Sequence, residues 1–187
     1  MPIRHERQGK YFEIQFNQDA DPVGGIITNF LLEKGRVVDP SKGERNFHIF
    51  YQFCKGASQQ QKQEYGLHGP DAFEYLVKGK CTDVSTIDDV KWWKETLEAM
   101  QVIGIAGNDQ ANLFKCLAAI LWLGNIEFQE TAGKAAVKNS DVLDFVATLL
   151  GVPASFVGNG LVIRQMETKH GARAGTNYAV PLNRMQV

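Results

Sequence analysis

The first hydrophobic and polar positions of the chain alternate with the period of a β-strand. Aromatic and aliphatic side chains take every second position between Tyr11 and Phe16, which is typical of a strand with one apolar face. Turn-forming residues follow from Asn17 to Pro22, and Ile26 to Leu32 is a second apolar run. The pattern predicts a β-hairpin, with the Gly24-Gly25 pair forming a bulge or tight bend at the start of its second strand.

The apolar period then changes to that of helices. Residues 34–42 are polar and turn-like, and they lead into an amphipathic helix predicted over Glu44–Lys55 and closed by Gly56. Three more helices are expected: one from Asp88 or Asp89 to Gly104, one over 111–123 behind an Asn108-Asp109 cap and before Gly124, and one from Ser140 to the stop at Gly151 and Pro153. The side chains expected to face inward are Phe47, Phe50, Tyr51 and Cys54, then Trp93, Leu97 and Met100, then Leu113, Phe114, Leu117, Ile120 and Leu121, and finally Val142, Phe145, Val146, Leu149 and Leu150.

Three segments are less regular. Residues 58–83 read as exposed loops and short helices, 133–138 is a weak segment, and 161–187 is extended and rich in glycine and arginine. There is no internal repeat or linker composition. We therefore expect one mostly helical α+β unit of 187 residues with a small β element at its start.

Composition narrows the class of protein. Hydrophobic content of 44%, charged content of 22% and a net charge of −1 are those of a soluble globular protein, and they favour neither nucleic acid nor a membrane surface as a partner. No apolar run is long enough to span a bilayer, and the N-terminus lacks the apolar core of a secretory signal. The widely spaced Cys54, Cys81 and Cys116 are expected to be reduced thiols, buried or partly buried, in a cytosolic protein.

The search for a nucleotide site is negative. A Walker loop needs Gly-x-x-x-x-Gly-Lys-Ser/Thr, in which backbone N–H groups cradle phosphate and the hydroxyl binds magnesium. The three Gly-Lys pairs continue with Tyr11, Cys81 and Ala135, none of which supplies the hydroxyl that binds magnesium. Asp21 to Gly24 matches a phosphate-sensor pattern but is better explained as the hairpin turn. His48 is expected to be structural, and Trp92 and Trp93 to be one surface and one core aromatic.

The C-terminal segment carries the clearest charge signal. Residues 161–187 hold Arg164, Lys169, Arg173 and Arg184 against the single acid Glu167, a net charge of +3. Such a segment can engage an acidic partner surface. Phosphorylation of Thr176 would offset most of this charge, since a phosphate adds about −1.5 to −2. The alternative is a solvated loop without a regulatory role.

Several strings in the chain closely resemble myosin motors, in particular class I myosins of the fungal type. They are GKYFEIQF at 9–16, LLEK at 31–34 with RVV at 36–38, ERNFHIFYQ at 44–52, LAAILWLGNI at 117–126, MET at 166–168 and YAVPLN at 178–183. The resemblance covers nearly the whole chain after residue 8 and keeps the order and spacing of the family.

The resemblance implies a fragment of the myosin motor fold, a P-loop NTPase fold. Residues 9–38 would be a hairpin of the central transducer sheet, 44–160 the helical upper subdomain, and 161–187 the actin-contacting loop region. The parent would be an ATP-hydrolysing, Mg²⁺-dependent class I motor that acts on actin filaments in the cytoplasm at the cell cortex, in endocytosis. Light-chain and membrane binding would belong to other parts of that parent.

The resemblance also implies roles for single residues. Arg7 falls on the arginine of the first nucleotide-sensor loop, whereas His5 and Glu6 replace its two serines. Lys169, Arg173, Thr176 and Tyr178 fall in the actin-contacting loop, with Thr176 at the phosphorylation position of class I myosins and a PAK-type kinase as its partner; Ala174 departs from the usual second arginine.

Without the Walker loop and the second sensor loop, the fragment alone is predicted to be inactive. We expect the remaining motor subdomains to be its structural partners. The alternative is a non-enzymatic actin-binding or scaffold fragment regulated by phosphorylation.

Overall fold

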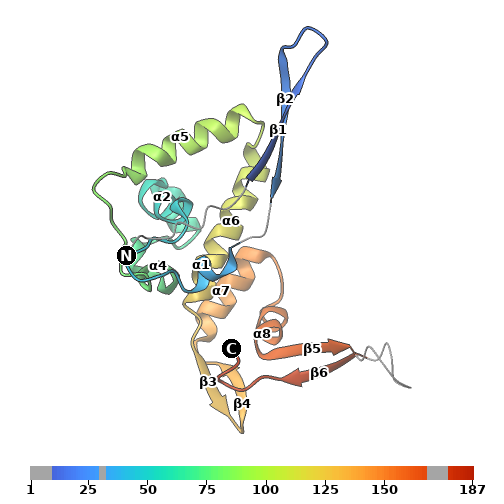
Figure 1. The fold of residues 1–187 in the computed structure, drawn as a ribbon. Coiled ribbons are helices and arrows are strands. Elements are labelled where there is room, and N and C mark those ends of the chain that lie inside the picture. Colours follow the sequence, from blue (N-terminus) through green and yellow to red (C-terminus); the bar gives the residue numbers. More distant parts are fainter. Residues whose placement is uncertain (1–9, 30–32, 168–176) are drawn as a thin grey trace.

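The computed structural model describes residues 10–29, 33–167 and 177–187. A helical body carries three separate two-stranded antiparallel sheets (Figure 1), so the α+β, mainly helical class is confirmed. The helices are α1 (Lys34–Val38), α2 (His48–Gly56), α3 (Gln59–Glu64), the 3₁₀ helix η1 (Pro70–Ala72), α4 (Glu74–Val77), α5 (Asp89–Val102), α6 (Gly107–Gly124), α7 (Ser140–Leu150) and α8 (Ala154–Val162). The strands are β1 (Lys10–Phe16), β2 (Pro22–Asn29), β3 (Phe128–Thr131), β4 (Lys134–Val137), β5 (Ile163–Glu167) and β6 (Asn177–Pro181).

The N-terminal hairpin forms as predicted and projects away from the helices (Figure 1). Its turn is built on Asn17, whose Oδ1 accepts from the N–H groups of Asp19 and Asp21 at 2.9 and 2.8 Å. Asp21 therefore belongs to the turn, as expected. The predicted bulge lies beside the two glycines: Phe16 pairs with Pro22 and Gln15 with Gly24, so Val23 is an extra residue on β2, while Gly25 pairs regularly with Ile14. Strand β2 starts at Pro22 rather than at the predicted Ile26.

Residues before α2 differ from the prediction in two ways. The turn-like stretch contains the short helix α1, and α2 starts at His48 rather than near Glu44. Asn46 explains the late start, because its N–H donates to the Tyr51 hydroxyl and its Nδ2 donates to the carbonyls of Val37 and Tyr75. These bonds hold the chain out of helical geometry ahead of α2.

The core lies where α2, α5 and α6 meet. The Phe53 ring packs 5.3 Å from Trp93 and 5.2 Å from Phe114, and Trp93 and Phe114 lie 5.0 Å apart, all measured between ring centroids. Such aromatic pairs contribute beyond the area that they bury. Trp93 is buried and Trp92 is 38% exposed, as expected for one core and one surface aromatic, but Leu113 and Leu150, both predicted to face inward, are exposed.

The irregular region after α2 supplies more of the core than its composition indicates. It forms the predicted short helices, and Ser58 caps α3 with a reciprocal capping box to Gln61. It also buries Tyr65, Leu67, Phe73 and Leu76, so the expectation of exposed loops is wrong for these side chains. The sparse spacing of its apolar residues hid this contribution.

Helices α5, α6 and α7 form where the apolar pattern predicts them, but the start of α6 differs from the prediction. Asp88 caps α5 by accepting from the N–H groups of Val90 and Lys91, and Gly151 ends α7 in the left-handed conformation. Helix α6 starts at Gly107 without a side-chain cap, so the predicted Asn108-Asp109 cap lies inside it. The prediction missed β3, β4 and α8, which are short or poor in buried residues.

Candidate functional site

The β5–β6 hairpin carries the described part of the predicted partner-binding segment. Its register pairs Arg164 with Val180 and Met166 with Tyr178. Directly opposed residues share a face of an antiparallel pair, so one face combines a guanidinium, a thioether, a phenol and an isopropyl group. Met166 and Tyr178 are 40% and 46% exposed. This face can contact a partner through both charge and apolar area.

The base of this hairpin continues directly from α8 and is also hydrogen-bonded to β4 through Leu182. The Leu182 N–H donates to the Val162 carbonyl, and the Leu182 carbonyl accepts from the Ala135 N–H, each at 2.8 Å. Leu182 therefore bonds both to the end of α8 and to β4. Figure 1 shows the β3–β4 and β5–β6 hairpins at the same end of the molecule.

Only one of the predicted site residues is described by the structure. Tyr178 lies on β6 opposite Met166. Lys169, Arg173 and Thr176 lie outside the described residues, as does Arg7. Their proposed roles therefore stay predictions. Met166 and Val180 were missed as individual contact residues; Met166 stands between the polar Gln165 and Glu167, which was a usable signal, whereas Val180 stands between Ala179 and Pro181 and gave none.

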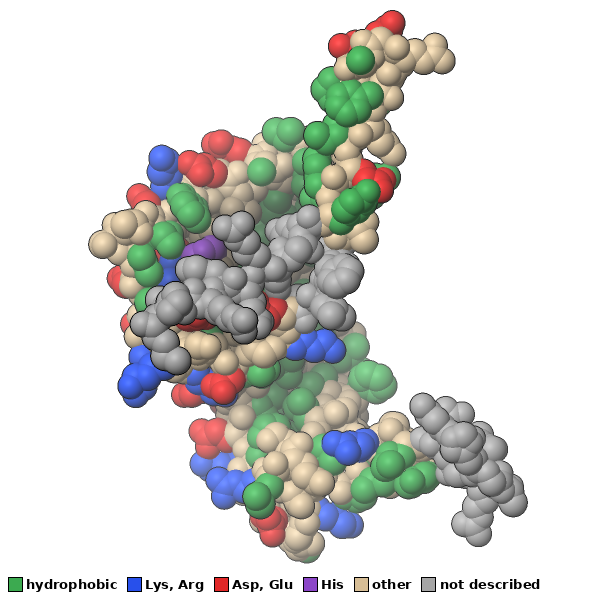
Figure 2. Space-filling view, viewed as in Figure 1, with side chains coloured by type: hydrophobic (Ala, Val, Ile, Leu, Met, Phe, Trp, Pro, Cys, Tyr) green, Lys and Arg blue, Asp and Glu red, His purple; other side chains and the backbone are tan. Residues whose placement is uncertain are grey.

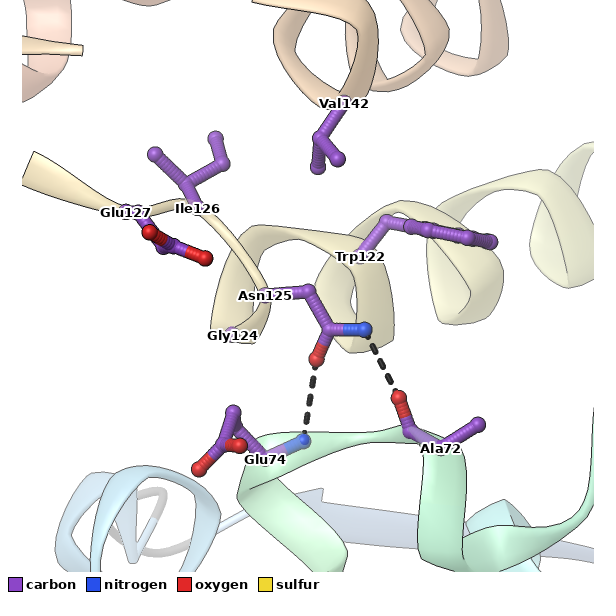
Figure 3. Close-up of a pocket in the computed structure, with 8 residues that line it drawn as sticks. All are labelled: Ala72, Glu74, Trp122, Gly124, Asn125, Ile126, Glu127 and Val142. Carbon is purple, nitrogen blue, oxygen red and sulfur yellow. Dashed lines mark hydrogen bonds between the residues drawn. The ribbon is translucent and has the colours of Figure 1, made fainter. Parts of the chain in front are cut away.

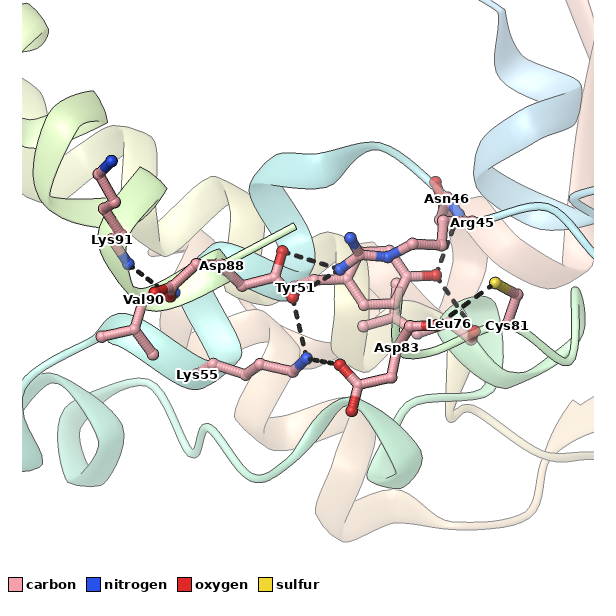
Figure 4. Close-up of polar contacts among 11 residues, drawn as sticks. Arg45, Asn46, Tyr51, Lys55, Leu76, Cys81, Asp83, Asp88, Val90 and Lys91 are labelled. Carbon is pink, nitrogen blue, oxygen red and sulfur yellow. Dashed lines mark hydrogen bonds and ion pairs between the residues drawn. The ribbon is translucent and has the colours of Figure 1, made fainter. Parts of the chain in front are cut away.

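A buried ionic cluster between α2 and α5 was also missed (Figure 4). Arg45 Nη2 lies 2.8 Å from each carboxylate oxygen of Asp89, and Lys55 Nζ lies 2.9 Å from Asp89 and 2.7 Å from Asp83. Arg45 also stacks over the Tyr51 ring, with Cζ 3.8 Å from the centroid. Within the described part of the chain, Nε and Nη1 of Arg45 have no hydrogen-bond partner.

The ion pairs of this cluster shift the pKa values of Asp83 and of the partly buried Lys55. Hydrogen bonding to Lys55 lowers the pKa of Asp83. Burial lowers the pKa of Lys55, but its bonds to Asp83 and Asp89 raise it by more, so the net shift is upward. These charged groups neutralise one another and include no nucleophile paired with a base. The arrangement is suited to joining two helices, not to acid–base chemistry.

The structure also shows the surroundings of His48 and of the three cysteines. His48 meets Trp92 edge to face at 5.8 Å, and burial, followed by the charge of Arg45, lowers the pKa of its imidazole. The three thiols are unpaired; Cys54 is buried and Cys81 is partly buried. Cys116 is exposed, contrary to the expectation of at least partial burial.

A cavity of about 510 Å³ opens at the end of α6 (Figure 3). Asn125 forms its floor: Nδ2 donates to the Ala72 carbonyl at 2.8 Å, and Oδ1 accepts from the Glu74 N–H at 2.9 Å. Both ends of the carboxamide are therefore occupied by backbone. The remaining lining residues are Trp122, Gly124, Ile126, Glu127 and Val142. A wall with two carboxylates and without lysine or arginine does not suit a triphosphate.

The described Gly-Lys pairs do not form a phosphate cradle either. A Cβ on Gly79 would lie 2.2 Å from the Glu44 carbonyl oxygen, so this glycine serves close packing of two backbone segments. Gly133 and Lys134 form the turn and first strand residue of the β3–β4 hairpin. In residues 10–29, 33–167 and 177–187, no group of three or more His, Cys, Asp or Glu side chains is placed to hold a metal ion. The described Gly-Lys pairs and the cavity beside Asn125 therefore do not offer the donor set that MgATP requires.

No single helix among the described residues is long and apolar enough to cross a membrane. Helices α7 and α8 meet that test only as a pair, and they are bent by 112° relative to each other.

Comparison with known proteins gives consistent matches over nearly the whole chain. Residues 4–187 match the family described as Myosin head (motor domain). The chain is 58% identical over 181 residues to the Myosin IC heavy chain of Dictyostelium discoideum, covering 96% of this chain and 15% of that protein. It is 51% identical to Myosin-1 of Coprinopsis cinerea (96% and 14%) and 52% identical to Myosin-5 of Candida glabrata (96% and 15%). The chain thus spans about 15% of the length of these relatives.

Proposed function

The chain belongs to the myosin head (motor domain) family, and from that premise we propose that it is the upper-subdomain part of an actin-based, ATP-driven class I motor. The observation that carries the proposal is the 58% identity to a myosin heavy chain over 96% of this chain. The proposed division is a transducer hairpin over 9–38, a helical upper subdomain over 44–160 and an actin-contacting region over 161–187. ATP and Mg²⁺ would be cofactors of the whole motor.

The chain by itself is not catalytic under this proposal. Phosphoryl transfer needs clustered donors and a bound divalent cation around the terminal phosphates. Neither the Gly-Lys pairs of the sequence nor the cavity beside Asn125 supplies that set. Nucleotide chemistry would therefore depend on parts of the motor beyond these residues.

The proposed filament contact is the β5–β6 hairpin together with the segment that it flanks. Support comes from the net charge of +3 over residues 161–187 and from the exposed Met166–Tyr178 pair on the described hairpin. Cations draw an acidic filament surface closer, and the apolar pair supplies area to bury on contact. Lys169, Arg173, Thr176 and Tyr178 are the proposed contact residues.

Thr176 is the proposed regulatory position, modified by a PAK-type kinase. A phosphate would add about −1.5 to −2 charges beside Arg173, enough to reorganise the charge pattern of this region. In a class I motor the corresponding cellular role would be at the actin cortex, in endocytosis, with light chains and membrane bound by other parts of the parent and no role for nucleic acid.

The β1–β2 hairpin is the proposed contact with the remaining motor subdomains. One of its faces carries Phe12, Ile14, Phe16 and Ile27, each more than half exposed, and Figure 2 shows apolar side chains along the projecting hairpin. An isolated two-stranded sheet with such a face is marginal in water. Further strands of the same central sheet would pair with its edges, and another layer of the motor would cover this face.

Co-sedimentation of the 187-residue chain with filamentous actin tests the proposed contact. We expect binding that weakens with salt, and about a tenfold loss of affinity in the double variant Lys169→Ala/Arg173→Ala, since each exposed ion pair contributes up to about 1 kcal/mol. The matched control removes two exposed cations from α5, Lys91→Ala/Lys94→Ala, and is expected to leave binding unchanged. Absence of binding by the wild-type chain, or equal losses in both double variants, would reject the proposed contact.

A further inference from the structure

We propose that Leu182 is a positioning residue: its two backbone hydrogen bonds set the direction in which the β5–β6 hairpin presents its contact face. The identity of the partner on that face rests on the proposed function above. The positioning role itself rests only on the described contacts at the base of the hairpin.

The two bonds connect three elements. One runs from the Leu182 N–H to the Val162 carbonyl, where α8 passes into β5, and continues the β5–β6 ladder by one pair beyond Ile163 and Pro181. The other runs from the Ala135 N–H on β4 to the Leu182 carbonyl and attaches this ladder to the β3–β4 hairpin. Ala135 is 7% exposed, so water has little access to compete for this N–H. The chain leaving β6 is thereby attached on one side to α8 and on the other to the edge of the β3–β4 hairpin.

Helix α8 is poorly suited to hold the hairpin alone. None of its residues is buried, its N-cap position is Pro153 with no side-chain cap bond, and it contains Gly158 and Gly160. Each glycine costs about 0.5–1 kcal/mol of helix stability relative to alanine. Partly buried Val157 and Leu161 pack α8 against the core, but the hairpin that continues from α8 can swing about its base unless its other strand is also anchored.

A small rotation at the base of the β5–β6 hairpin becomes a large displacement at its far end. A strand of five residues is about 17 Å long at roughly 3.3 Å per residue. A rotation of about 10° at the base then moves the far end by about 3 Å, which is as large as a hydrogen-bond distance. A second attachment at Leu182 restricts that rotation to the axis through the two attachment points, because any other rotation would stretch the bond between Ala135 and Leu182.

One substitution removes the β4 attachment without changing charge. The N–H of Ala135 points to Leu182 rather than to β3, so Ala135→Pro deletes this bond and leaves the β3–β4 ladder its other donors. Ala135→Ser keeps the N–H and is the matched control. Spin labels on the exposed Cys116 and on Gln165→Cys, in a Cys81→Ser background, report the hairpin direction by dipolar electron resonance, while Cys54 is buried and stays unlabelled.

We expect a narrow distance distribution in the parent and in Ala135→Ser, and a broader or shifted one in Ala135→Pro, with circular dichroism unchanged. Actin affinity should fall about tenfold in Ala135→Pro with the same salt dependence as the parent, because no charge is lost. An unchanged distribution in Ala135→Pro, or equal broadening in Ala135→Ser, would overturn the positioning role.

A measurement on the unmodified chain covers the case in which Ala135→Pro does not fold. Hydrogen exchange of the Ala135 and Leu182 amides should be slow in the wild-type chain, and exchange as fast as at the exposed Met185 would overturn the proposal. Failure of the wild-type chain to bind actin would reject the proposed function alone, since the label distances and amide exchange do not depend on a partner.

Discussion

Arg45 and Asp89 form a bidentate ion pair in which the guanidinium Nη2 lies 2.8 Å from both carboxylate oxygens. The two side chains are 4% and 1% exposed, and their residues are 44 positions apart in the chain. The pair joins the segment before α2 to the first turn of α5. It therefore ties together two of the helices that enclose the aromatic core.

Removing one partner of this pair should destabilise the protein strongly. Asp89→Ala leaves the Arg45 charge buried without its counter-ion, and we expect the free energy of unfolding to fall by about 3–5 kcal/mol. Urea denaturation followed by circular dichroism measures this. Lys91→Ala is the control, because its pair with Glu95 is exposed and should change stability by less than about 1 kcal/mol. Similar small losses in both variants would contradict a structural role for the buried pair.

Two glycine-to-alanine changes in helices should have opposite effects. A methyl group at Gly56 would lie 2.5 Å from the Cβ of the buried Trp93, so Gly56→Ala forces α2 and α5 apart at a cost of about 1–3 kcal/mol. At Gly160 nothing lies within 4 Å of the new methyl group. Gly160→Ala should therefore stabilise α8 by about 0.5–1 kcal/mol. Thermal melting compares the two, and the same sign for both would contradict the packing described for Gly56.

The pH dependence of stability should include a contribution from His48. Burial and the nearby Arg45 charge lower the pKa of His48 in the folded state, so the unfolded chain binds the proton more readily. The contribution of His48 to the free energy of unfolding is fully present above the pKa of histidine in the unfolded chain, about 6.5, and is lost as the pH falls below it. The variant His48→Gln should lack this acid loss when unfolding is measured between about pH 7.5 and 5.5. Parallel curves for the two proteins would refute the assignment.

MgATP should not bind tightly to this chain. The three Gly-Lys pairs lack the following hydroxyl, and the cavity beside Asn125 is lined by Glu74 and Glu127. Isothermal titration calorimetry with MgATP is expected to show no saturable heat at micromolar concentrations. Tight uptake by the pure chain, or hydrolysis of ATP by it, would contradict the reading of these residues as structural.

The exposed face of the β1–β2 hairpin should bind a hydrophobic dye. Replacing Phe12, Ile14 and Phe16 together by serine removes three apolar side chains that are each more than half exposed, and the fluorescence of bound ANS should fall with helix content unchanged. The control replaces Val102 and Ile103 by serine, since these side chains at the end of α5 are 85% and 70% exposed and do not belong to the hairpin. Equal falls in both variants would show that dye binding is not specific to the hairpin.

Family membership and the order of the main elements were readable from the chain alone. Alternation between Tyr11 and Phe16 predicted β1, Asp88 and Gly104 bounded α5, and Gly151 ended α7. These signals are local, since side-chain period and capping chemistry act over a few residues. The matching strings predicted the myosin family, and the family match over residues 4–187 confirms that prediction.

Errors arose where a distant contact overrides the local pattern. The start of α2 is delayed because Asn46 bonds to Val37 and Tyr75. Leu113 has the correct helical spacing but lies on the exposed side of α6. Periodicity identifies an apolar stripe, but only the neighbouring elements decide which part of it is covered.

What the sequence by itself determined is therefore the family, the helix and hairpin order, and the absence of a Walker motif within these residues. Only the tertiary structure decided that Arg45 meets Asp89, that Leu182 joins β4 to α8, and that Met166 and Tyr178 share one exposed face. The physical reason is range: propensity and capping are set by adjacent residues, whereas these contacts depend on the packing of elements far apart in the chain.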